Sequence, residues 1–136
     1  MIIVLVLIFS LFGPFFLLPL EQFLPWPHIF EELFKLIVVV FLVRAENQNK
    51  KNYFIYLILA AAIFSTSESI LYLMNFFLLW NIDNLFSRLI LTSLLHLTTS
   101  IIIYFGVKSG KGRTLFALLF AIVIHYLYNT KIAVFF

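Results

Sequence analysis

The sequence contains no cysteine and very little charge. Without cysteine, disulfides, thiolate nucleophiles and cysteine-ligated metals are excluded. Charged residues make up only 11% of the chain and hydrophobic residues 64%, and the mean hydropathy is +1.12. The longest hydrophilic stretch, residues 44–52, is nine residues long, too short for a water-soluble domain. We therefore predict that residues 1–136 form a single domain in the lipid of the cell membrane.

The formal net charge of +3 comes largely from two small basic clusters between hydrophobic runs. One comprises Arg44, Lys50 and Lys51, and the other comprises residues 108–113 (KSGKGR). Clusters in such positions are typical of topology signals, so no nucleic-acid partner is expected. The first apolar run lacks both a preceding basic region and an obvious cleavage site, which favours a retained helix.

The hydrophobic runs predict an all-α, polytopic bundle of about five transmembrane helices, because each crossing needs about 20 mostly apolar residues. Their approximate bounds are 2–20, 28–43, 53–80, 85–107 and 114–130. A short turn is expected at 81–84. The loops after the second and fourth spans are basic, and those after the first and third carry no Lys or Arg. The positive-inside rule then predicts a cytoplasmic N-terminus and an external C-terminus.

Several charged residues interrupt these apolar spans. They are Glu31, Glu32, Lys35, Glu68 and Arg88. A charge near the bilayer centre costs about 2.5–3.5 kcal/mol on insertion scales, so an intramembrane charge indicates a functional site. The argument is strongest for Glu68, which lies deep in its span.

Helical spacing places the polar residues on particular faces. The third span has a stripe of Ser65, Glu68, Tyr72 and Asn75, the fourth one of Arg88, Thr92, His96 and Thr99, and the fifth has His125 and Asn129 one turn apart. At a rise of ~1.5 Å per residue, polar groups from four helices fall at similar depths in the outer half of the bilayer. This convergence predicts a buried polar site.

Each group also has a structural interpretation. Glu31 precedes Lys35 by four residues and can pair with it, and carboxylates near a helix N-terminus are favoured by the helix dipole. Glu68 and Tyr72 could form an interhelical hydrogen-bonding pair. We interpret His28 as structural. The functional interpretation is that Lys35 holds one carboxylate ionised and leaves the other as a general base.

Four ordered motifs strengthen the functional interpretation. They are EELFK at 31–35, SESILY at 67–72, RLILTSLLH at 88–96 and HYLYN at 125–129. In this order the chain resembles the PrsW family of intramembrane proteases, relatives of the CAAX prenyl endopeptidases and bacteriocin-processing proteases. It departs from the family pattern at Phe30, where members often have glutamate, and at Ser67, where they often have an aromatic residue.

The resemblance implies an intramembrane endopeptidase acting on a membrane protein or membrane-anchored peptide. Glu31 or Glu32 would deprotonate a water, His96 would position it, and His125 and Asn129 would donate to the oxyanion. Glu68 belongs to the same catalytic set, with Lys35, Tyr72 and Arg88 in support. No cofactor is expected under this hypothesis.

Two alternatives remain at this stage. The first is a metal-dependent version of the same protease, in which zinc would be held by Glu32, His96 and His125. The second is a non-enzymatic polytopic protein, such as a proton-coupled transporter or an assembly or scaffold factor. Such proteins also place Glu and His in the membrane.

Overall fold

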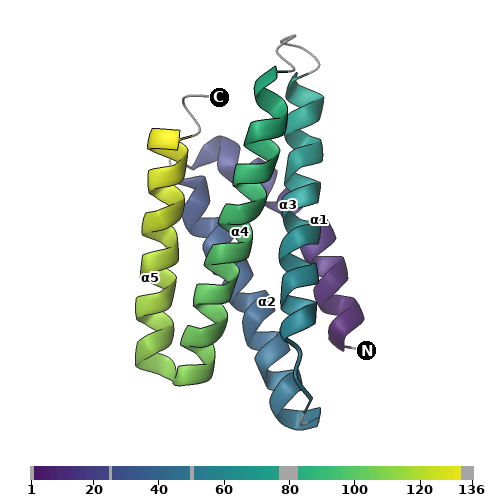
Figure 1. Cartoon of the computed structure of the whole chain (residues 1–136), viewed down its shortest axis with the longest axis vertical. Helices are drawn as coiled ribbons and strands as arrows, with labels where there is room; N and C mark the ends of the chain where they lie inside the picture. The colour runs from purple at the N-terminus through teal and green to yellow at the C-terminus, as the bar shows by residue number, and fades with distance from the viewer. Residues whose placement is uncertain (1, 25, 50, 77–82, 133–136) are drawn as a thin grey trace.

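The structure is a computed structural model that describes residues 2–24, 26–49, 51–76 and 83–132, without the side chains at 20–22, 72, 74–76, 83–88 and 132. Every regular element in these ranges is a helix. The elements are α1 (Ile2–Phe23), α2 (Pro27–Asn49), α3 (Phe54–Phe76), α4 (Asp83–Ser109), α5 (Lys111–Leu127) and a π-helical turn, η1 (Tyr128–Ile132). The predicted all-α bundle is confirmed (Figure 1).

Four of these helices, α1, α3, α4 and α5, are long and apolar enough to cross a membrane. Helix α2 is more polar, since it carries Glu31, Glu32 and Lys35 and ends in the hydrophilic stretch 44–49. The three charged side chains are nevertheless buried. Helix α2 packs against α1, α4 and α5, so its charges face protein instead of lipid. The chain is therefore a multi-pass membrane protein.

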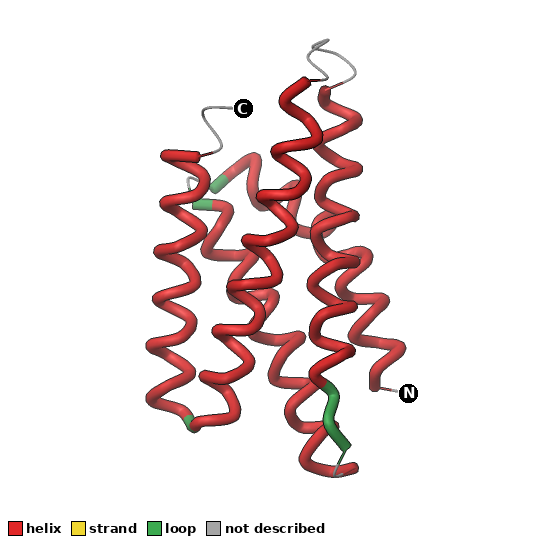
Figure 2. The backbone as a smooth tube through the Cα atoms, in the orientation of Figure 1, coloured by secondary structure: helices red, strands yellow, loops and turns green. Residues whose placement is uncertain are grey.

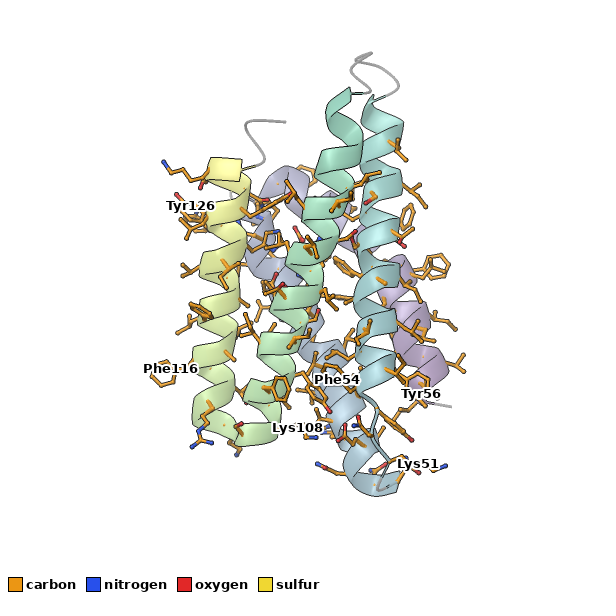
Figure 3. The ribbon with its side chains drawn as sticks, in the orientation of Figure 1. Lys51, Phe54, Tyr56, Lys108, Phe116 and Tyr126 are labelled. Atoms are coloured by element: carbon orange, nitrogen blue, oxygen red, sulfur yellow. The ribbon has the colours of Figure 1, made fainter. Side chains whose placement is uncertain are left out.

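The outside of the bundle is apolar. Phe16 and Phe116 are 67% and 76% exposed, and Figure 3 shows Phe116 pointing away from the helices. In water such a surface would aggregate, but in a bilayer it faces acyl chains while the backbone hydrogen bonds are satisfied within each helix.

The buried residues are apolar at one end of the bundle and polar or charged toward the other. At one end a hydrophobic core forms around Val39, Leu42, Leu57 and Ile103. Toward the other end the buried positions are charged or polar, beginning with Lys35, only one turn before Val39. The hydrophobic core therefore holds the helices together at one end of the bundle and supports a polar site at the other.

The basic connections lie together at the end of the bundle with the hydrophobic core, as Figure 2 shows for the two loops after α2 and α4. Both are shorter than the sequence predicted. Helix α2 continues to Asn49, and the expected loop 108–113 is helical except at Gly110. Gly110 adopts φ +111°, which a glycine accommodates readily, so α4 turns directly into α5.

Small residues let these two helices approach closely near the turn. A Cβ on Gly106 would lie 2.4 Å from the Cβ of Ala117. Toward their other ends α4 and α5 diverge, with α2 behind them (Figure 1). The third predicted span ended at residue 80 and was followed by a turn at 81–84; α3 is described to Phe76, and residues 77–82 lie outside the described part.

Candidate active site

One face of α2 supplies the acidic part of the site. His28, Glu31, Glu32 and Lys35 recur at helical spacing, and all four side chains are buried. Lys35 Nζ lies 2.6 Å from Glu32 Oε1, its neighbour at i−3. The sequence analysis offered Glu31, at i−4, as a residue that can pair with Lys35; the contacts described for the ammonium are with Glu32 and Thr99.

Glu32 is the centre of a buried hydrogen-bonded network. Its Oε1 accepts from Lys35 Nζ at 2.6 Å and from His125 Nδ1 of α5 at 2.7 Å. Lys35 also donates to Thr99 Oγ1 of α4 at 3.0 Å. Glu32 and Thr99 have no exposed surface. Two donors on one oxygen hold this carboxylate as the charged partner of the network.

A second pair connects α3 and α4. His96 Nε2 forms an ion-pair contact with Glu68 Oε2, and the His96 ring packs at 5.2 Å from that of Phe64. His96 is completely buried and the Glu68 side chain is 12% exposed. The face of Phe64 also receives Lys35, whose Nζ lies 5.8 Å from the ring centroid. Phe64 thus lies against both His96 and Lys35.

The two networks meet at the histidines. The rings of His96 and His125 stand edge to face, with centroids 5.5 Å apart. His125 Nε2 lies 3.7 Å from Glu31 Oε2, on the side of the ring opposite Glu32. Ligand atoms of Glu31, Glu68 and His96 all lie within 4.8 Å of one another.

We call Glu31, Glu32, Glu68, His96 and His125 the Glu/His cluster. Four helices supply it: α2, α3, α4 and α5. The structure thus brings together five of the six residues predicted as catalytic. The desolvation penalty of such a buried set can exceed what its ion pairs return, so we take this cluster as the candidate active site.

The remaining predicted residues are Asn129, Tyr72 and Arg88. Asn129 lies on η1 and is half-buried, and no described contact joins its side chain to the cluster. The π-helical turn changes the rotation per residue, so Asn129 does not simply follow His125 around the α5 face. Tyr72 and Arg88 are in α3 and α4, but their side chains lie outside the described residues, as does that of Asn75.

Two residues that the sequence analysis did not assign to the site contact it: the His28 ring lies 6.1 Å from that of His125, and Thr99 accepts from Lys35. A third, Tyr128, hydrogen-bonds Thr92 at 2.8 Å, one turn before His96 on α4. Spacing offered a signal for two of them, because His28 precedes Glu32 by four residues and Tyr128 follows His125 by three.

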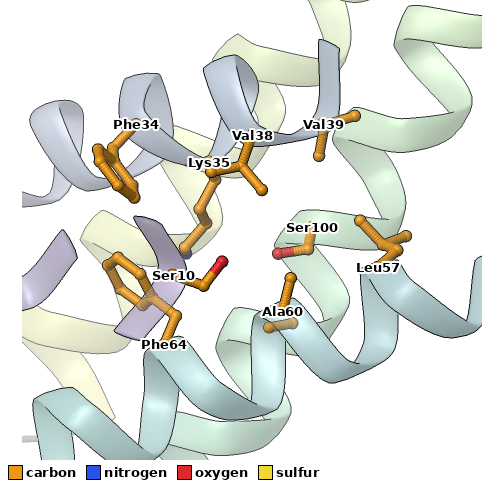
Figure 4. A pocket seen from close by; sticks show the side chains of 10 residues that line it. Ser10, Phe34, Lys35, Val38, Val39, Leu57, Ala60, Phe64 and Ser100 are labelled. Carbon is orange, nitrogen blue, oxygen red and sulfur yellow. The ribbon is translucent and has the colours of Figure 1, made fainter. Parts of the chain in front are cut away.

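A small cavity lies beside Lys35, between α1, α2, α3 and α4 (Figure 4). Ser10 and Ser100 present their hydroxyls to it, and Phe34 and Phe64 cover one side. Its volume, about 10 Å³, is enough for one water molecule. The cavity can therefore hydrate Lys35 but cannot admit a peptide.

An ion pair joins α2 and α4 at the opposite end of the bundle. Glu46 accepts from Lys108 Nζ at 2.6 Å and from the Tyr104 hydroxyl at 2.7 Å. Burial tends to raise the pKa of Glu46, but these hydrogen bonds outweigh it and hold the pKa below its usual value. The contact joins the helix that carries Glu31 and Glu32 to the helix that carries His96, outside the cluster.

One known protein family matches the chain over nearly its whole length. A family model described as PrsW family intramembrane metalloprotease matches residues 4–135. The chain belongs to the PrsW family. It is therefore an intramembrane protease, a peptide hydrolase whose substrates are membrane proteins. Searches of curated proteins and of solved structures found no match.

The family description implies a metal, and the residues present suit one. Glu31, Glu68 and His96 offer two carboxylate oxygens and an imidazole nitrogen, and zinc is bound by donors of both types. The alternative predicted from the sequence grouped Glu32, His96 and His125. Among the described residues the structure groups a different trio, because Glu32 Oε1 and His125 Nδ1 are bonded to each other.

Proposed function

We propose that this PrsW-family protein cleaves a peptide bond within the bilayer by activating water in the Glu/His cluster. The observation that carries the proposal is the meeting of Glu31, Glu68, His96 and His125 in one buried space between four helices. The family assignment favours hydrolysis over the transporter and scaffold alternatives. The sequence left the base as either Glu31 or Glu32; the contacts favour Glu31.

In this mechanism Glu32 positions His125. By accepting from Nδ1, Glu32 fixes the ring so that Nε2 faces Glu31 at 3.7 Å, and Lys35 keeps the carboxylate charged. The arrangement has the logic of an Asp–His pair, in which the carboxylate orients the imidazole and stabilises its protonated form.

Glu31 then serves as the general base. It accepts a proton from the water as the water oxygen bonds to the scissile carbonyl carbon. The proton passes to His125 Nε2, and the imidazolium, stabilised by Glu32, delivers it to the leaving nitrogen as the C–N bond breaks. The products are a carboxylic acid and an amine. His96 and Glu68 position the water on the other side.

A metal held by Glu31, Glu68 and His96 would supply Lewis acidity to the water and the carbonyl oxygen. Glu31 would then share its carboxylate between the metal and the proton. Asn129 remains the proposed amide donor to the oxyanion, as the family resemblance implies.

We further propose that the end with the basic connections faces the cytoplasm. Lys51 and Lys108 lie at this end, whereas Tyr126 lies toward the other (Figure 3). The Glu/His cluster then lies in the outer half of the bilayer. A single cysteine in place of Gln48 or of Thr130, in a chain that has none of its own, tests this. An impermeant thiol reagent added outside cells should label the Thr130 position and not the Gln48 position; the reverse would overturn the topology.

The catalytic assignment is tested with purified protein in lipid nanodiscs and a panel of synthetic single-span peptides of about 22 residues. Glu31→Gln and His125→Ala should lower cleavage at least about 10³-fold, the scale of losing a group that acts in the transition state. Glu46→Gln, on the same helix but outside the cluster, is the matched control and should retain activity. Full activity of Glu31→Gln would refute the role of base.

Metal content provides a readout that does not depend on turnover. Elemental analysis should find about one metal per wild-type chain, retained in Glu32→Gln and lost in Glu68→Gln and His96→Ala. Loss of metal in Glu32→Gln with retention in Glu68→Gln would instead support the trio of Glu32, His96 and His125. Cleavage by metal-free protein would show that the carboxylates suffice.

A further inference from the structure

A groove between α4 and α5 lies beside the Glu/His cluster. It has a volume of about 310 Å³ and is lined by four residues of α4 and three from α5 and the turn that follows it, all leucine or isoleucine except Thr98 and Tyr128. Leu94, Thr98 and Leu127 in its wall are exposed on the surface of the bundle. The groove therefore opens where α4 and α5 face lipid.

Two residues of the groove wall are chain neighbours of the catalytic histidines. Leu95 directly precedes His96, and Ile124 directly precedes His125. Tyr128 lines the groove, and its hydroxyl forms a buried hydrogen bond with Thr92 of α4 at 2.8 Å. Thr92 and Tyr128 lie one helical turn from His96 and His125, on the same helix faces, so this hydrogen bond lies one turn along α4 and α5 from the cluster.

Size restricts what the groove can hold. A cavity of about 150 Å³ accommodates benzene, so 310 Å³ holds roughly two large apolar side chains. An intact helix, 10–12 Å across with its side chains, is too wide. The cavity beside Lys35 holds one water, and of the two cavities described the groove alone has room for substrate.

We infer that this groove binds the apolar side chains next to the scissile bond of a locally unwound transmembrane substrate segment. The inference rests on the proposed function, because the occupant is the membrane-protein substrate that the protease must bring to His96 and His125. The hydrogen bond between Thr92 and Tyr128, one helical turn from both histidines, favours that occupant over a lipid chain. Large residues such as leucine and phenylalanine should be preferred over glycine and serine.

The experiment measures binding without cleavage, in a Glu32→Gln background in nanodiscs. Leu94, in the groove, or Leu119 is replaced with the photocrosslinker p-benzoylphenylalanine. These leucines are 54% and 51% exposed, and Leu119 lies about 140° around α5 from Ile124. The probe is a biotinylated 22-residue peptide carrying phenylalanine, leucine or glycine at its centre.

Crosslinking at the Leu94 position should exceed that at the Leu119 position at least tenfold, compete with unlabelled peptide and decrease in the glycine peptide. Thr98→Trp, which fills the groove from the lipid side, should lower crosslinking at the Leu94 position at least tenfold, whereas Leu119→Trp should not. Equal or absent crosslinking at both positions overturns the inference.

The two proposals fail in different ways. Cleavage by wild-type protein without selective crosslinking at the Leu94 position would refute the groove and leave the catalytic assignment intact. Selective, competed crosslinking combined with undiminished cleavage by Glu31→Gln would refute the catalytic assignment and leave the groove as the binding site. A labelled site recovered by mass spectrometry outside the central residues of the peptide would also contradict the groove assignment.

Discussion

The buried contact between Lys35 and Glu32 offers the sharpest test of how this site is held together. In Lys35→Met the side chain keeps its length but loses its charge, so the completely buried Glu32 carboxylate keeps His125 as its described partner and loses the ammonium at 2.6 Å. Thr99 loses its described donor as well.

The size of the stability loss in Lys35→Met follows from the burial of both partners, Lys35 and Glu32. Removing one partner of a buried ion pair costs about 3–5 kcal/mol, a factor of roughly 10²–10⁴ in the folding equilibrium. Replacing the Glu32 carboxylate with the neutral amide of glutamine removes most of that cost, because burying an amide costs much less free energy than burying a charge that has lost its ion-pair partner. The double variant Lys35→Met/Glu32→Gln should therefore be more stable than Lys35→Met alone, although it should remain inactive.

The assay is reversible unfolding of purified protein in mixed micelles, with peptide cleavage measured on the same samples. Lys108→Met is the matched control: this lysine also pairs with a glutamate at 2.6 Å, but its side chain is 40% exposed, so its loss should cost less than about 1 kcal/mol. If Glu32→Gln fails to restore stability to Lys35→Met, the pair does not carry the energy assigned to it.

Three further outcomes are expected. Tyr128→Phe removes the hydrogen bond to Thr92, which is worth about 0.6 kcal/mol between membrane helices. Its loss should increase crosslinking of bulky peptides in the groove roughly threefold. An unchanged crosslinking yield would show that the hydrogen bond does not restrict entry of the peptide into the groove. His28→Ala should lower cleavage about tenfold by freeing the His125 ring, with His28→Phe restoring most of it; equal loss in both would implicate the imidazole itself. Because the folded-state pKa of Glu46 lies below its ordinary 4.5, its stabilising contribution is complete above pH 4.5 and lost as the pH falls through the folded value. Acid titration of wild-type protein should show this loss, and Glu46→Gln should lack it.

Much of the architecture is encoded locally. Membrane residence follows from composition, and the helices follow from the length of the apolar runs, so these predictions needed no tertiary information. The stripe on α4 is also local: His96 and Thr99 share a face because an α-helix repeats every 3.6 residues, and both face inward in the structure.

The helix ends were less predictable. The basic segment 108–113 reads as a loop by composition, yet α4 and α5 consume all of it except Gly110. Polar residues are compatible with a helix that projects beyond the hydrocarbon, so polarity marks the end of a span and not the end of its helix.

The sequence by itself determined that this is a helical membrane protein with carboxylates and histidines on inward faces at similar depths. Only the tertiary structure decided which of them meet: Lys35 with Glu32, His96 with Glu68, and His125 between two glutamates. Periodicity gives the face of a helix on which a side chain lies. It does not give the rotation and register of one helix against another, which depend on close packing between helices at sites such as Gly106. For the same reason the groove beside Tyr128 is a property of how α4 and α5 diverge, and no single segment of the sequence contains it.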